Sequence, residues 1–214
     1  MEAARAEGIV LRKQPVTESS LVVTWFTREA GKLKTMAKGA RRVKGPLVGK
    51  IDLFYQDEIL YLPSRRGELH LLTDCFLVNP YRRLRGSVAA LTAAAYACEL
   101  VESITELEDA QPGIFEALAG VLEALGREDK RPALLIWFEL RLLALAGWEP
   151  RWETRAGVDR MLKSLTGSTL AAAQRVKLNA AQVREARELV WRFWDGEVGR
   201  TPKSRLALEQ VAFL

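Results

Sequence analysis

The sequence predicts an α+β protein in which a small N-terminal β-barrel precedes an all-α helical bundle. Up to residue 80 the chain consists of short runs rich in β-branched and aromatic residues, separated by tight turns. From Tyr81 onward, apolar residues recur at steps of three and four, which is the period of a helix. We therefore expect a first domain in residues 1–80 and a second in residues 81–214, a division that 214 residues allow.

Five segments of the first part are typical of strands. A glycine-rich, basic loop at residues 39–49 separates the third from the fourth. Five short strands in so short a chain fit a closed barrel, and a five-stranded OB-fold has the matching size. The expected strands are residues 7–13, 20–26, 32–38, 51–62 (with a bend near Gln56 and Asp57) and 68–74.

The second part shows four helical segments. An apolar stripe runs through residues 88–101, and Pro112 is placed as the first residue of the next helix. The stretch between Pro132 and Gly147 is apolar almost all round, which predicts a buried central helix. Asn179 and Gln182 resemble a capping box at the start of the last helical set.

Basic residues gather between Arg28 and Lys50. This stretch holds eight lysines and arginines against the single acid Glu29, although the net charge of the whole chain is only +5. The lysines of residues 32–38 share one face of the expected strand, and charge without nearby acids attracts phosphate. The alternative is a solvated face that protects an edge strand from aggregation. We favour nucleic-acid binding, with these contacts: Lys32, Lys34, Lys38, Arg41, Arg42, Lys44 and Lys50.

Aromatic residues of the expected strands could add stacking surfaces for bases. The candidates are Trp25, Phe26, Phe54 and Tyr55. Because strands alternate between two faces, we expect at least half of them to lie in the core.

The enzyme motifs we sought are missing from the sequence. Residues 45–50 look faintly like a phosphate-binding loop, but they lack one spacer residue, and Ile51 stands where a magnesium-binding Ser or Thr would be. His70 has no evident catalytic partner, and Cys75 and Cys98 are expected to be buried thiols. We therefore expect no catalytic residue, no cofactor and no metal site.

The helical part offers one further candidate surface. Trp137 and Phe138 lie near basic residues and could form an apolar pocket for an acidic peptide, although plain helix packing is the preferred interpretation. The candidate partner-binding residues are Lys130, Arg131, Trp137 and Arg141. The most apolar stretch, residues 133–146, is too short to span a bilayer, so we expect a soluble cytoplasmic protein with no membrane partner.

Several stretches, taken together and in order, resemble the bacterial recombination mediator family RecO. The most specific combination is GKLK…AKGAR at residues 31–41 with FELRLLALAGW at residues 138–148. The similar stretches are EGIVLRK (7–13), VTWFTREAGKLKTMAKGARR (23–42), IDLFYQDEILYL (51–62), AAAYACELVESI (93–104), WFELRLLALAGWEP (137–150) and GRTPKSR (199–205).

The resemblance implies an OB-fold followed by a helical domain, and a protein that is not an enzyme. It implies binding to single- and double-stranded DNA, annealing of complementary strands, and work with RecR. It also implies contact with the C-terminal tail of single-stranded DNA-binding protein, so that RecA can be loaded, and a nucleoid-associated location.

Two departures from the family pattern stand out. Many members carry a CxxC…CxxC zinc module after the central helix, where this chain reads RWETRAGVDRML (151–162) without cysteine. The family's basic position before FEL is Trp137 here. An RNA-binding barrel and a protein–protein adaptor remain as alternatives, and a DNA-acting enzyme is the least favoured.

Overall fold

The computed structural model describes residues 2–127, 131–152 and 158–211. It forms two compact units, each of which is considered by itself. The first holds residues 1–81 and 105–119, and the second holds residues 82–104 and 120–214. The segment 105–119, which the sequence analysis assigned to the helical domain, thus lies in the same unit as the strands. The domain boundary at residues 80 and 81 stays a prediction.

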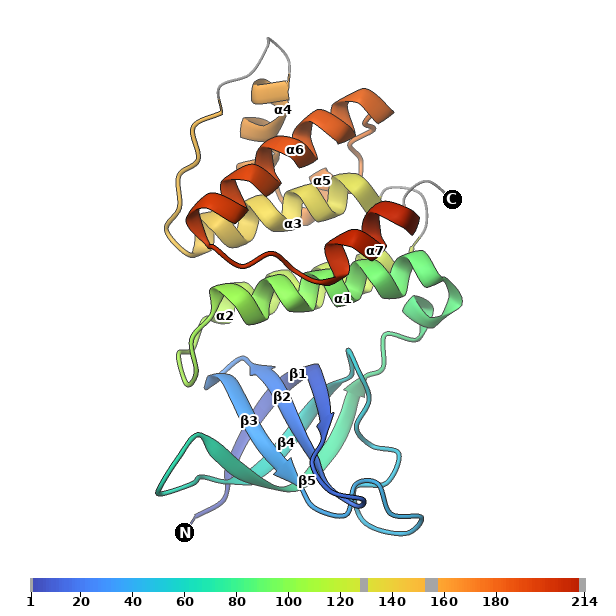
Figure 1. The fold of residues 1–214 in the computed structure, drawn as a ribbon, viewed down its shortest axis with the longest axis vertical. Coiled ribbons are helices and arrows are strands. Elements are labelled where there is room, and N and C mark those ends of the chain that lie inside the picture. The colour runs from blue at the N-terminus through green and yellow to red at the C-terminus, as the bar shows by residue number, and fades with distance from the viewer. Residues whose placement is uncertain (1, 128–130, 153–157, 212–214) are drawn as a thin grey trace. The chain divides into compact units, whose positions relative to one another are not determined.

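The first unit is a closed five-stranded barrel with the strand order β1-β2-β3-β5-β4 (Figure 1). β3 and β5 are parallel, and all other neighbouring strands are antiparallel. This arrangement confirms the predicted OB-fold barrel. The strands are β1 (Ala4–Pro15), β2 (Leu21–Thr27), β3 (Gly31–Ala37), β4 (Gln56–Leu62) and β5 (Leu69–Asn79).

The alternation of β3 explains how the barrel acquires its core. Leu33 and Ala37 lie in the interior, whereas Lys34 and Met36 are only partly buried. On the neighbouring strand the indole of Trp25 is fully buried, and its Nε1 donates a hydrogen bond to the Thr35 hydroxyl at 2.8 Å. The aromatic ring therefore fills the barrel without leaving its polar atom unpaired.

The fourth strand starts later than predicted. Residues 51–55 are not strand, and β4 begins at Gln56. Phe54 has a φ of 69°, a left-handed conformation that a period-two pattern does not reveal. Its N–H donates to the carbonyl of Val10 at 3.0 Å, next to an irregularity of β1 between Val10 and Arg12. The irregularity and the left-handed residue together turn the chain into the strand.

The helices follow the predicted pattern around a central helix. α3 contacts α1, α4, α5 and α6, and residues 133–140 are all buried, which confirms its central position (Figure 1). α2 begins at Pro112, and Asn179 forms a capping box with Gln182, both as predicted. The helices are η1 (Arg82–Gly86), α1 (Val88–Ile104), α2 (Pro112–Leu125), α3 (Arg131–Leu145), α4 (Val158–Thr166), α5 (Leu170–Ala173), α6 (Ala180–Glu197) and α7 (Ser204–Val211). Within the described ranges, none of these helices combines the length and apolar character that crossing a membrane requires.

A buried polar cluster joins four helices of the second unit. The Oε1 of Glu139 in α3 accepts hydrogen bonds from the hydroxyl of Tyr96 in α1 and, at 2.9 Å, from Nε1 of Trp191 in α6. The guanidinium of Arg205 in α7 lies 4.8 Å from the Trp191 ring centroid, and its Nη1 donates to both carboxylate oxygens of Asp195. Burial raises the pKa of Glu139. These bonds compensate part of the cost of burying charge.

Candidate nucleic-acid interface

The Lys32 end of β3 is covered by residues 105–109. The N–H of Glu108 donates to the Lys32 carbonyl at 3.0 Å, as a neighbouring strand would. The Lys32 ammonium donates to the carbonyl of Thr105, and the residue is only 8% exposed. The lysine face that the sequence analysis expected for residues 32–38 is therefore not exposed at Lys32. Its side chain is on the outer face, but a segment far away in the sequence lies over it.

Two more residues of the basic stretch contact residues 105–119 of the same unit. Gly31 has a φ of 67°, and a Cβ atom there would lie 1.9 Å from the carbonyl oxygen of Asp109, so no larger residue fits. Arg28 forms ion pairs with Glu7 and Glu116. The exposed part of the basic surface therefore starts at Lys34.

The loop between β3 and β4 carries those predicted DNA contacts that are exposed. Lys38, Arg42 and Lys44 are exposed, and none of them forms an ion pair with a carboxylate in the part of the chain that the structure describes. Leu47 is 3% exposed and packs into the barrel core, so the loop is anchored at its far end. Val43, at 93% exposure, marks the solvent-facing part of the loop.

Hydrogen bonds also tie this loop to the connection between β1 and β2. The N–H of Arg41 donates to the carbonyl of Ser19 at 3.1 Å, and its Nη1 donates to the carbonyl of Thr17 at 2.9 Å. Both partners are neutral carbonyls, so the positive charge of Arg41 is not cancelled. The bonds hold the charge in place near the barrel.

Lys34 and Lys50 are predicted contacts that have acidic partners. Lys34 Nζ lies 3.4 Å from Glu68 Oε2, and Lys50 Nζ donates to Asp74 Oδ1 at 2.7 Å. The hydrogen bond raises the pKa of Lys50 and lowers the pKa of Asp74. Because both pairs face solvent, they contribute little to stability, and a phosphate could replace either acid.

The pairing of β1, β2 and β3 adds Arg12 to the candidate interface, a residue that the sequence analysis did not select. Arg12 pairs with Thr24, and Thr24 pairs with Lys34, so these three residues form a row across β1, β2 and β3. Arg12 is exposed. Its proximity to Lys34 depends on strand pairing, and a pattern read along one strand could not show it.

The stacking candidates are mostly core residues. Trp25 and Phe26 are fully buried, Phe54 is 5% exposed, and Tyr55 is partly buried. The expectation that at least half would lie in the core is confirmed. Phe76 is 48% exposed instead, with Lys50 Nζ 5.3 Å from its ring centroid.

The structure describes two side chains of the four partner-binding candidates in the helical part, Trp137 and Arg141. Trp137 is 5% exposed, and its Nε1 donates to the carbonyl of Ser168 at 3.0 Å, so it belongs to the helix packing. Arg141 is exposed. Lys130 and the side chain of Arg131 lie outside the described residues. A role of these four in partner binding stays a prediction.

The histidine and the cysteines are structural. His70 Nδ1 accepts a hydrogen bond from the N–H of Ser64 at 3.0 Å, and its Nε2 lies 3.2 Å from Glu108 Oε1. Cys75 and Cys98 are buried free thiols, as predicted. Burial raises the pKa of Cys75 to about 12, so its reactive thiolate is disfavoured. In the described ranges, no three His, Cys, Asp or Glu side chains gather as they would around a metal ion.

Both halves of the chain match models of one protein family. The model described as recombination protein O N terminal matches residues 1–81, and the model described as recombination protein O C terminal matches residues 85–164. The chain belongs to the recombination protein O family. The predicted resemblance to RecO is thereby confirmed.

Curated RecO proteins from several bacteria are similar to this chain. DNA repair protein RecO of Syntrophus aciditrophicus is 32% identical over 146 residues, which cover 68% of this chain and 56% of that relative. DNA repair protein RecO of Desulforudis audaxviator is 33% identical over 157 residues, and the match spans 62% of its length. DNA repair protein RecO of Anaeromyxobacter dehalogenans (strain 2CP-1) is 29% identical over 248 aligned positions, covering 99% of this chain and 98% of the relative. The matches support a role of this RecO-family chain in DNA repair.

Proposed function

We propose that this protein is a recombination mediator that binds single- and double-stranded DNA through its barrel and anneals complementary strands. In recombinational repair it acts with RecR to load RecA onto DNA coated with single-stranded DNA-binding protein, whose C-terminal tail it contacts. Membership of a DNA repair family supports the pathway. DNA binding rests on one observation, the exposed loop beside β3 whose basic residues Lys38, Arg42 and Lys44 lack carboxylate partners among the described residues.

The proposed mechanism is electrostatic. The cations of the loop bind phosphates and release counterions, which favours binding at low salt. Neutralising the phosphates of two strands also reduces their repulsion, while their bases stay free to pair. Lys34, Arg41 and Lys50 extend this site, and Lys32 acts by holding residues 105–109 rather than by binding phosphate.

A charge-reversal pair of variants tests this proposal. Lys38→Glu/Arg42→Glu/Lys44→Glu changes the net charge by six units, and Arg175→Glu/Lys177→Glu/Lys203→Glu is a matched control with the same change at exposed positions of the second unit. Fluorescence anisotropy measures the affinity for single strands and duplexes over a range of salt, and a strand-annealing assay measures activity. Circular dichroism checks that each variant is folded.

We expect the loop variant to lose DNA binding and annealing, whereas the control keeps most of both. Because three lost contacts to a single strand change the slope of log affinity against log salt by about 0.7 each, the slope should fall by about 2. Equal losses in both variants would mean that binding depends on total charge and not on this loop, and a loss in the control alone would place the site in the second unit. Preference for RNA in a competition experiment would favour an RNA-binding barrel.

A further inference from the structure

The last part of β5 presents three successive apolar side chains to solvent. Phe76, Leu77 and Val78 are 48%, 48% and 54% exposed. A regular strand would turn every second one inward, but the pairing of β4 with β5 shifts between Gln56 and Asp57, which leaves Val78 without an opposite residue. We call these three residues the β5 strip. Single exposed apolar residues are common on soluble proteins, whereas contiguous ones mark interaction sites.

A pocket of about 530 Å3 adjoins the β5 strip, and its lining is acidic. Val78 belongs to both, and Glu58 lines the pocket and pairs with Phe76 across the two strands. The other lining residues are Arg5, Ala6, Glu7 and Glu29. Three carboxylates therefore face a single guanidinium, and we call this hollow the acidic pocket. Its volume lies within the range of ligand sites, which is roughly 300–1,000 Å3.

The carboxylates of the acidic pocket are held in place, and one of them has no cationic partner. Glu58 forms an ion pair with Arg5, and Glu7 forms one with Arg28 at 3.1 Å. Glu29 Oε2 accepts a hydrogen bond from the N–H of Glu7 at 2.8 Å. Glu29 is exposed and forms no ion pair with any residue that the structure describes. Its charge is therefore available to a basic ligand.

An apolar strip that ends in an acidic pocket matches the chemistry of a basic segment of protein. Lysine and arginine lay their apolar stems along apolar surface while the head group reaches polar partners. The ring of Phe76 already accommodates such a group, because Lys50 Nζ lies 5.3 Å from its centroid. Asp74 pairs with that ammonium at 2.7 Å. Nucleic acid does not fit this surface, because carboxylates repel phosphates.

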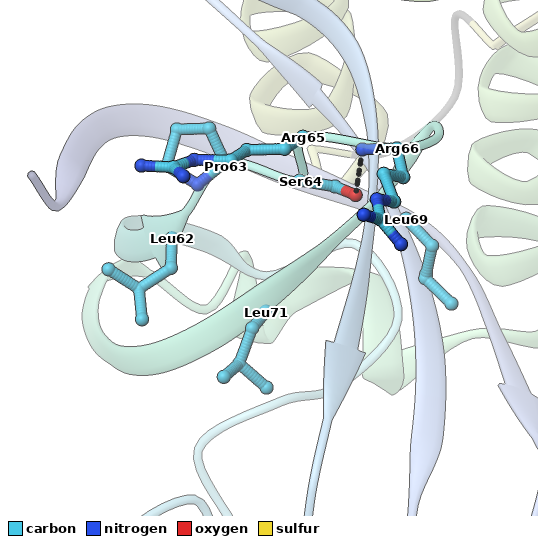
Figure 2. Close-up of a pocket in the computed structure, with 7 residues that line it drawn as sticks. All are labelled: Leu62, Pro63, Ser64, Arg65, Arg66, Leu69 and Leu71. Atoms are coloured by element: carbon cyan, nitrogen blue, oxygen red, sulfur yellow. Dashed lines mark hydrogen bonds between the residues drawn. The ribbon is translucent and has the colours of Figure 1, made fainter. Parts of the chain in front are cut away.

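A second pocket of the barrel has leucines but the opposite charge. It lies in the hairpin between β4 and β5, where Leu62, Leu69 and Leu71 extend to one side and Arg65 and Arg66 lie near the turn (Figure 2). These arginines repel a basic segment. The hairpin therefore provides a control position at which an apolar side chain is exposed without nearby acidic lining.

We propose that the β5 strip and the acidic pocket form a docking surface for a basic segment of a partner protein. An apolar side chain of that segment packs on the strip, and a lysine or arginine head group reaches Glu29. The order of the strands places β4 across the barrel from β2 and β3. The partner therefore binds on other strands than the proposed DNA contacts of β3, and this inference goes beyond the proposed function.

Single variants test the apolar and the acidic part of the surface separately. Phe76→Ser removes the exposed ring, Val78→Ser is a second strip variant, and Leu69→Ser is their control in the hairpin. Glu29→Gln removes the charge but keeps an acceptor oxygen, and Glu188→Gln is its control at an exposed position of α6. Circular dichroism checks that each variant is folded.

Three labelled synthetic peptides of equal length serve as probes, and fluorescence anisotropy measures their binding to the full chain. The first is composed of lysine, leucine and serine. The second has serine in place of each leucine, and the third has glutamate in place of each lysine. Comparing them separates the apolar from the basic requirement of the surface.

We expect the wild type to prefer the lysine–leucine peptide to the other two. Phe76→Ser should weaken its binding about three- to tenfold, because the exposed half of a phenylalanine side chain is no longer there to leave water. Glu29→Gln should weaken it about two- to fivefold at low salt and not at about 1 M salt, where exposed ion pairs are screened. Leu69→Ser and Glu188→Gln should bind as the wild type does.

Other results would overturn the proposal. If the wild type does not bind the lysine–leucine peptide, or prefers the acidic one, the surface has been assigned the wrong ligand. If Leu69→Ser loses as much as Phe76→Ser and Val78→Ser, the peptide adheres to any exposed apolar residue. If the chain alone self-associates in sedimentation velocity and Phe76→Ser abolishes this, a second copy covers the strip. None of these measurements involves DNA, so their failure is distinct from a failure of the proposed function.

Discussion

Asp57 should make the stability of the barrel fall as the pH rises. The residue lies on β4, is fully buried, and neither carboxylate oxygen has a hydrogen-bond partner among the described residues. Burial raises its pKa from 3.8 to about 7, because an ionised carboxylate is poorly solvated inside a protein. The folded state therefore holds a proton at pH values where the unfolded chain has released it.

The sign and size follow from proton linkage. A folded pKa above the unfolded value gives full stability below pH 3.8 and a progressive loss as the pH rises toward 7. The shift of about three units corresponds to a total loss of about 4 kcal/mol, at about 1.4 kcal/mol per unit. Between about pH 5 and pH 8 the loss should be about 2 to 3 kcal/mol, which is large beside a typical net stability of ~5–15 kcal/mol.

Asp57→Asn is the variant that isolates this effect, because it keeps the shape and removes the charge. Urea unfolding followed by circular dichroism gives the free energy of unfolding at both pH values, and the m-value shows whether the unfolding remains comparable. We expect the variant to gain about 2 to 3 kcal/mol on the wild type as the pH is raised from about 5 to 8. A constant difference between the two proteins, or an NMR titration of the Asp57 carboxyl near pH 4, would refute the reasoning.

Three further predictions concern the packing of each unit. Gly31→Ala should destabilise the barrel unit by more than Gly49→Ala in urea unfolding, because both residues have positive φ but only Gly31 would also clash with Asp109; equal losses would mean that φ alone matters. Glu139→Ala should cost about 2–6 kcal/mol, at about 1–3 kcal/mol for each of the two donors left unpaired, whereas Glu139→Gln, which keeps an acceptor oxygen, should cost much less; the thermal midpoints of the two variants separate them, and equal midpoints would contradict the role of Oε1. Asn179→Ala should cost about 1 kcal/mol through loss of the helix cap, and an unchanged urea midpoint would show that the cap does not contribute.

Much of the fold could be predicted because local chemistry and final structure agree. Leu33 and Ala37 of β3 lie in the core, as its alternating pattern predicts, because successive side chains of a strand point to opposite faces. Pro112 and Asn179 mark helix starts because the first N–H groups of any helix have no hydrogen-bond partner within it. Proline has no N–H to leave unpaired, and the asparagine side chain accepts a hydrogen bond from one of these groups. These signals act within a few residues of each other.

What could not be predicted depends on contacts between distant residues. Lys32 is on the face that its pattern assigns, yet it is covered by Thr105 and its neighbours, 73 positions away. The parallel pairing of β3 with β5 brings Lys34 next to Leu69, and neither strand's own sequence indicates which residues pair. The aromatic positions show the same limit, since Phe76 and not Phe54 reaches solvent.

The return of the chain to the barrel unit has a consequence for protein synthesis. The strands are complete at Asn79, but the segment that covers Lys32 follows only after the 17 residues of α1. Translation adds about 5–20 residues per second, so a nascent barrel waits on the order of a second or more with Lys32 and the backbone at that end of β3 uncovered. For the same reason, a fragment that stops at residue 81 should remain in that open state permanently. It would expose the unpaired backbone at the Lys32 end of β3 and tend to associate with other copies of itself.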